Sequence, residues 1–170
     1  IQLYSSSEDD IIYYTLDGST PKTSSSIIYT EPILINNTTV IKARTFETNM
    51  LPGEIFVSTY FIDEEPTMPT ISFITSPNTL WDQEIGIYSN EYKQREIPAT
   101  IQYFEDENTY GFTANAGARL GGLNIWTKPQ KPFTIYTRDR FGQEFIQYQL
   151  FKSKSIANFS RIVLRNGGDD

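Results

Sequence analysis

Lys131 is the residue whose type and position point most directly to nucleotide chemistry. It lies between Gln130 and Pro132, directly before the strand-like run 133–137. A lysine ammonium is a flexible point charge that reaches phosphate groups. The alternative is a solvated lysine on an edge strand, where such a charge discourages aggregation. The residue alone leaves both interpretations open.

A glycine-rich stretch at 117–122 is the second feature that suggests phosphate contact. Gly121 and Gly122 would let the backbone of a loop approach a phosphate group closely. Glycines that cluster between strands more often mark a bulge or a tight turn, so that interpretation is favoured. Gly121 and Gly122 are kept beside Lys131 as candidate nucleotide-binding residues.

Other side chains offer binding chemistry with a simpler structural explanation. Asp17, in the sequence Asp-Gly-Ser-Thr-Pro, is a candidate calcium ligand, but an aspartate that caps its own turn explains it better. Aromatic rings offer flat faces for stacking on sugars, although aromatic residues at strand spacing more often belong to a core. The aromatic candidates are Trp81, Tyr88, Tyr92, Tyr110 and Trp126.

Composition removes several classes of function. The 170 residues include no Cys and no His, which excludes thiolate and imidazole metal sites and nucleophiles that need a Cys or His partner. We therefore expect no metal site and no catalytic residue here. The net charge of −7 lacks the positive field that nucleic-acid binding requires. No apolar run is long enough for a transmembrane segment, and the ends suggest a piece of a longer protein.

The elements that must position these residues are mostly strands. The sequence is rich in Ile, Thr and aromatic residues, which predicts an all-β fold. The first part contains strand-like runs at 1–4, 11–16, 33–35, 38–46 and 55–62. The second part contains them at 71–75, 99–104, 133–137, 145–150 and 162–164, together with the glycine-rich stretch 117–122. Short helices are expected only around 78–83 or 152–158.

A domain boundary is predicted where this pattern stops. The segment 63–69 (Asp-Glu-Glu-Pro-Thr-Met-Pro) combines three acids with two prolines and has no strand alternation. We predict a β-sandwich over 1–63, a linker over 64–69 and a second β-rich domain or lobe over 70–170. The strand 38–46 should lie in the middle of the first sheet, because it contains no proline. Ile41 and Ala43 on this strand should pack against Tyr14 and Leu16 to form the core, whereas Lys42 lies on the other face and its replacement by Ala should be nearly silent.

The first part resembles a known family. The segments Tyr-Tyr-Thr-Leu-Asp-Gly-Ser-Thr-Pro (13–21) and Thr-Val-Ile-Lys-Ala (39–43), with Tyr29 and Pro32-Ile33 between them, resemble the chitobiase/β-hexosaminidase C-terminal type module. The resemblance covers about residues 1–63. It implies an immunoglobulin-like or fibronectin-like sandwich that serves as an accessory domain in secreted bacterial proteins.

The second part resembles the N-terminal part of CotH-type proteins, which include atypical secretory kinases. The segments that carry the resemblance are 86–88, 97–99, 115–122, 129–133, 138–142 and 164–169. The resemblance implies that Lys131 approaches a nucleotide phosphate and that the acidic base and metal ligands lie beyond residue 170.

These observations favour a non-catalytic fragment of a secreted or cell-surface, bacterial-type CotH-like protein. Its sandwich would attach the larger protein to a surface glycan or protein, with no cofactor of its own. One alternative is the N-terminal lobe of an atypical secretory kinase that binds ATP through Lys131, with ATP and Mg as cofactors of the full-length parent. Another is a purely structural spacer. Whether the parent is an enzyme is left open by the sequence.

Overall fold

The computed structural model describes residues 1–64, 66–105, 109–121 and 129–166. The chain separates into two compact units, of which the first is Ile1–Met68 and the second combines Pro69–Glu105 with Thr109–Asp170. Both units are built from antiparallel sheets, which confirms the predicted all-β class. No helix among the described residues has the length and apolar character needed to cross a membrane.

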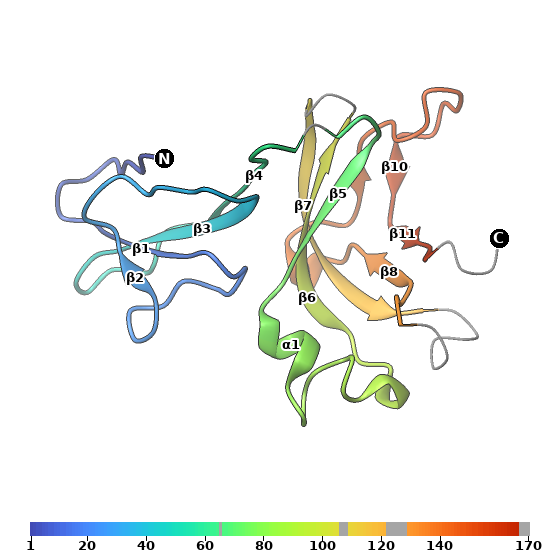
Figure 1. Ribbon diagram of the computed structural model, residues 1–170, viewed down its shortest axis with the longest axis horizontal. Helices are drawn as coiled ribbons and strands as arrows, with labels where there is room; N and C mark the ends of the chain where they lie inside the picture. Colours follow the sequence, from blue (N-terminus) through green and yellow to red (C-terminus); the bar gives the residue numbers. More distant parts are fainter. Residues whose placement is uncertain (65, 106–108, 122–128, 167–170) are drawn as a thin grey trace. The chain divides into compact units, whose positions relative to one another are not determined.

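The first unit contains one four-stranded sheet with the order β2-β1-β3-β4 (Figure 1). The strands are β1 (Ile11–Thr15), β2 (Ile27–Ile28), β3 (Thr39–Phe46) and β4 (Phe56–Tyr60). All neighbouring strands are antiparallel. The prediction that 38–46 runs through the middle of the sheet is therefore confirmed, since β3 pairs with β1 on one side and β4 on the other.

Two predictions about the core of this sheet are corrected. Ile41 and Ala43 on β3 are buried, as expected, but Lys42 between them is also buried, at 8% exposed. A central strand is covered over part of both faces, so alternation does not bring Lys42 into solvent. Leu16, expected in the core, is 41% exposed because β1 ends at Thr15 and the chain bends away.

The two outermost strand predictions in this unit are wrong. The segments 1–4 and 33–35 form no strand. They are joined instead by two long-range hydrogen bonds, in which the amide of Ile33 donates to the carbonyl of Ile1 over 2.8 Å and the N-terminal ammonium donates to the carbonyl of Ile33. These two hydrogen bonds hold the two segments together but do not extend the β-sheet.

The second unit contains a five-stranded sheet with the order β11-β8-β7-β6-β5 (Figure 1). Its strands are β5 (Thr70–Ile74), β6 (Ile97–Phe104), β7 (Tyr110–Leu120), β8 (Phe133–Tyr136) and β11 (Arg161–Leu164). A two-stranded ribbon pairs β9 (Ile146–Gln147) with β10 (Asn158–Phe159). The helical elements are short: α1 (Pro77–Trp81), η1 (Glu91–Lys93) and η3 (Asp139–Phe141).

The core of the second unit lies on one face of its sheet. Ile97 pairs with Ala118 and Ile101 with Ala114, so isoleucines on β6 lie opposite alanines on β7. Ile135 on β8 and Ile87 from the loop complete this layer. The alanines leave room for the isoleucines, which is the complementarity expected of a packed interior.

The glycine-rich stretch 117–122 continues β7 through Leu120, as its strand-like character predicts, and these residues form no turn. Two other predictions in this unit need correction. The run 145–150 contains only the two-residue strand β9, and no helix forms over 152–158, where the chain returns to pair β10 with β9. The helix expected around 78–83 is present as α1.

Candidate functional site

A groove on the first unit is lined by two exposed aromatic rings. Tyr4 comes from the beginning of the unit's sequence and Phe56 from near its end. We call it the Tyr4–Phe56 groove; its volume is about 270 Å³ and its lining residues are Gln2, Leu3, Tyr4, Ile12, Ala43, Arg44, Thr45, Glu54 and Phe56. The side chains of Tyr4 and Phe56 are 82% and 49% exposed. Ala43 stands directly opposite Phe56 in the pairing of β3 with β4. Its small side chain leaves open space beside the larger ring.

The polar groups of the groove are held in place. Arg44 donates from Nε to the carbonyl of Gly53 over 2.6 Å, and its guanidinium lies over the ring of Phe46 at 5.8 Å, on the face of β3 opposite to Ala43. The hydroxyl of Tyr4 donates to Gln2 Oε1 over 2.5 Å. A second hollow of about 520 Å³ shares Leu3, Tyr4 and Ile12 with the groove. Flat rings beside hydrogen-bonding groups are suited to a ligand that has both apolar and polar faces.

Lys131, the predicted phosphate ligand, is buried and ion-paired. Its Nζ lies 3.2 Å from Oε1 of Glu91 on η1, and the lysine side chain is 7% exposed. The alternative of a solvated lysine on an edge strand is wrong, because β8, which follows Lys131, lies between β7 and β11. Burial of a lysine requires such a partner. The pair fixes η1 to the start of β8.

Gly121 pairs through its backbone with Pro132, which follows Lys131 in the sequence. Its amide donates to the carbonyl of Pro132 over 2.9 Å, which extends the pairing of β7 with β8. A Cβ at Gly121 would approach Thr134 Oγ1 to 2.7 Å, so the glycine permits this close contact. Gly122, the third candidate nucleotide-binding residue, lies outside the described residues. The nucleotide assignment of these residues stays a prediction.

The aromatic candidates of the second unit divide into different environments. Trp81 is 58% exposed and lies against Tyr88 with ring centroids 4.4 Å apart. Tyr88 in turn contacts Phe133 at 6.2 Å, and burial together with the charge of Glu91 raises the pKa of Tyr88. The three rings of Trp81, Tyr88 and Phe133 therefore lie beside the Lys131–Glu91 pair. Tyr92 and Tyr110 are exposed, and Trp126 lies outside the described residues.

Asp17 caps its own turn, as predicted. Its Oδ1 accepts hydrogen bonds from the amide of Ser19 at 2.9 Å and from the Ser19 hydroxyl at 2.6 Å, while Gly18 has a φ of 80°. Partial burial raises the pKa of Asp17, but these bonds and the charge of Lys42 outweigh it, so the pKa lies below its ordinary value. In the described part of the chain, no group of three or more acidic side chains gathers to hold a metal ion.

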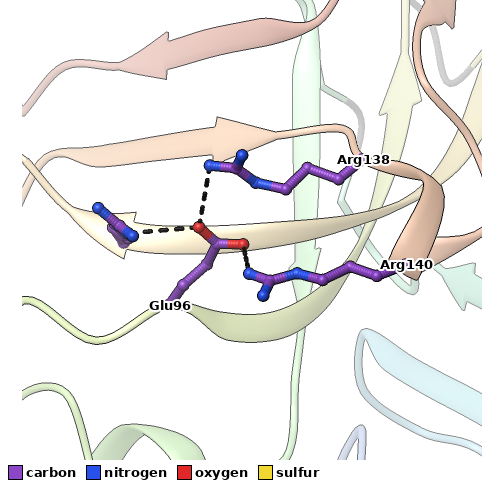
Figure 2. Close-up of polar contacts among 4 residues, drawn as sticks. Glu96, Arg138 and Arg140 are labelled. Atoms are coloured by element: carbon purple, nitrogen blue, oxygen red, sulfur yellow. Dashed lines mark hydrogen bonds and ion pairs between the residues drawn. The ribbon is translucent and has the colours of Figure 1, made fainter.

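A cluster in the second unit joins Glu96 to three arginines (Figure 2). We call it the Glu96 cluster; it consists of Glu96, Arg119, Arg138 and Arg140. Oε2 of Glu96 lies 3.3 Å from Arg119 Nε and 3.3 Å from Arg138 Nη2, and Oε1 pairs with Nη2 of Arg140. The Glu96 side chain is 5% exposed. Burial raises its pKa, but Arg140 and Arg138 outweigh that effect, so the pKa lies below its ordinary value.

Sequence reasoning did not identify the Tyr4–Phe56 groove or the Glu96 cluster. The signal for the groove is weak, because Tyr4 and Phe56 are separated by most of the first unit. The spacing of Arg138 and Arg140 was visible only as part of the CotH-type resemblance. Their convergence on Glu96 depends on how β8 and the loop after it pack against β6 and β7.

Comparison with protein families finds a match for the first part of the chain. Residues 1–58 match the family model described as the chitobiase/beta-hexosaminidase C-terminal domain. The match confirms the resemblance of the first unit to this carbohydrate-associated domain. No curated protein and no solved structure matches the chain. Nothing in these comparisons matches 59–170, so the CotH-type resemblance of the second unit stays a prediction.

Proposed function

We propose that the chain is a non-catalytic accessory part of a secreted or cell-surface, bacterial-type protein, and that its first unit attaches the protein to carbohydrate. The family matched by residues 1–58 is described as the chitobiase/beta-hexosaminidase C-terminal domain, and these two names refer to chitobiose and hexosamine sugars. An oligosaccharide built from such sugars is therefore the first ligand to test.

The Tyr4–Phe56 groove is the single observation that carries this proposal. A sugar ring has an apolar face of C–H groups and a rim of hydroxyls. The exposed rings of Tyr4 and Phe56 offer apolar faces, and Glu54, which also lines the groove, offers a carboxylate acceptor.

The test is the affinity of the whole chain for chito-oligosaccharides, measured by calorimetry. Tyr4→Ala and Phe56→Ala remove the two rings, and we expect each to weaken binding about tenfold, which corresponds to about 1.4 kcal/mol. Tyr92→Ala is the matched control, because Tyr92 is an exposed aromatic residue of the other unit, at 69%. Equal affinities for wild type and both groove variants would overturn the assignment of this groove.

A second candidate function is supported by the Lys131–Glu91 pair. Protein kinases hold the lysine that contacts ATP phosphates through an ion pair to a glutamate. A buried lysine that is paired in this way at the start of a central strand supports the proposal that the second unit is the N-terminal lobe of a CotH-type kinase, in which Lys131 binds ATP. Gly121 and Gly122 would then lie near the phosphates, with Mg supplied to the full-length parent.

Titration of the chain with ATP and Mg tests the second candidate. We expect ATP binding that Lys131→Ala abolishes, with no phosphate transfer, since transfer also requires metal-holding carboxylates and a group that orients the nucleophile. Lys93→Ala is the control for a lost lysine charge, because Lys93 is exposed on the same element as Glu91. Metal-dependent autophosphorylation by this chain would show that it is catalytic and would contradict the first proposal.

A further inference from the structure

The Glu96 cluster has more positive charge than its one carboxylate neutralises. Three guanidinium groups face a single carboxylate, which leaves two positive charges in a chain whose net charge is −7. Like charges held together are unfavourable unless further anions approach them. The cluster is thus a local positive site on an acidic protein.

Hydrogen-bond donors of the cluster also exceed the acceptors that Glu96 offers. A carboxylate accepts about four hydrogen bonds, whereas each guanidinium carries five N–H donors. Arg138 and Arg140 donate to Glu96. Nε of Arg119 is buried and lies within ion-pair distance of Glu96, yet it makes no hydrogen bond in the described part of the chain. A buried donor without an acceptor is costly, and a bound ligand is one way to satisfy it.

The arginine side chains are held in position by aromatic rings. Tyr136 lies under two guanidinium groups, with its ring centroid 4.9 Å from Cζ of Arg138 and 5.7 Å from Cζ of Arg119. Arg140 lies 4.8 Å from the ring of Phe141. These contacts reduce the freedom that the guanidinium groups would lose on binding a ligand, so the site is preorganised.

The arginines are open to solvent while the carboxylate is not. The side chains of Arg119, Arg138 and Arg140 are 42%, 45% and 60% exposed, against 5% for Glu96. Arg161 on β11 pairs directly with Tyr136 on β8 and therefore stands on the same face of the sheet. Glu96 thus forms the floor of the site, and the arginines face outward.

We propose that the Glu96 cluster binds a phosphate or sulfate group. Planar guanidinium groups bind such oxyanions with paired N–H donors, and Arg is preferred to Lys where this geometry matters. Glu96 aligns the arginines and lowers the affinity by its own charge, which allows the anion to be released. The group is either a free inorganic ion or an ester on a surface glycan.

The test uses the whole chain and inorganic phosphate, with a sulfated disaccharide as the second probe. Binding should shift the side-chain Nε–H NMR signals of Arg119, Arg138 and Arg140 in the wild type. R140Q should weaken phosphate binding about tenfold, as loss of a charge-assisted hydrogen bond does. E96Q should strengthen it, because the competing charge is removed. K154Q, which removes an exposed charge elsewhere in the second unit, should leave it unchanged.

The outcomes separate the proposal from a purely structural cluster. Unshifted arginine signals in the wild type would overturn it, and this measurement does not depend on whether any variant folds. Equal weakening by R140Q and K154Q would also overturn it, because binding would then reflect general charge. If inorganic phosphate binds as tightly as the sulfated disaccharide, the ligand is a free ion. If the disaccharide binds more tightly, the ligand is an ester on a glycan. Either result supports an anion-binding site at the Glu96 cluster.

Discussion

Glu96 shows how a buried carboxylate stays ionised. Its folded-state pKa lies below the ordinary value of 4.5, because Arg140 and Arg138 outweigh the effect of burial. The ionised form therefore contributes stability that is present at neutral pH and is lost as the pH falls below 4.5 towards the lower folded value. We expect Glu96→Gln to lower the free energy of unfolding by about 1–3 kcal/mol at pH 7.

Urea unfolding across the acid range checks this prediction. The difference between wild type and Glu96→Gln should shrink as the pH falls, because wild-type Glu96 becomes protonated and loses its charge. Asp9→Asn is the control, since Asp9 is an exposed acid in the first unit. A difference that stays constant down to the acid limit would mean that the charge of Glu96 does not stabilise the fold.

Tyr148 provides a second titration at the opposite end of the pH scale. Its hydroxyl donates to Oε1 of Glu105 over 2.5 Å, and this hydrogen bond, with smaller effects of burial and charge, raises the pKa of Tyr148 to about 12. A raised folded pKa gives stability that is complete below the ordinary value of 10.0 and is lost as the pH rises from there towards 12.

Spectroscopic titration of tyrosine ionisation tests this assignment. One tyrosine should ionise near pH 12 in the folded wild type, and that late step should be missing in Tyr148→Phe. Glu105→Gln should move the step to lower pH, because it removes the negative charge that opposes ionisation. A late step that persists in Tyr148→Phe belongs to another tyrosine.

Strand β3 determines the stability of the first unit because it is the central strand. Ile41 on this strand is fully buried, and Ile41→Ala should lower the free energy of unfolding by about 2–5 kcal/mol. Lys42 is buried as well; burial lowers the pKa of its ammonium, against the opposing charge of Asp17. Lys42→Ala should therefore cost about 1 kcal/mol or more through the lost packing of its methylene groups, instead of being silent.

Thermal unfolding of Ile41→Ala, Lys42→Ala and Lys42→Met distinguishes these contributions. Lys42→Met keeps the buried stem and removes the charge, so it should be closer to wild type than Lys42→Ala. If Lys42→Ala has the melting temperature of wild type, the side chain is solvated in solution and the description of β3 is wrong.

The sequence predicted strands better than it predicted their edges and faces. Strand β3 and most of the five-stranded sheet were found from β-branched and aromatic runs, and the turn at Asp17-Gly18 from its turn-forming residues. Lys42 and Leu16 were placed wrongly, because alternation says nothing about what covers each face of a central strand. The convergence of Arg140 on Glu96 was not predictable, since it depends on packing between segments distant in the sequence.

At the scale of the whole molecule, the division into two units is open to a direct test. The segment 63–69 contains clustered acids and two prolines, and the first unit ends at Met68. We expect limited proteolysis to cut within 63–69 before it cuts elsewhere, because backbone outside sheets is the more accessible substrate. First cuts inside β3 or β7 would contradict the predicted linker.

The central claim is that the first unit attaches the protein to carbohydrate through the Tyr4–Phe56 groove. Amide NMR mapping of the wild-type chain during titration with a chito-oligosaccharide tests it most directly, since it needs no variant. The account predicts shifts that saturate and concentrate at residues of the groove, such as Tyr4, Arg44 and Phe56. Absence of shifts at these residues, or saturating shifts confined to the second unit, would contradict it.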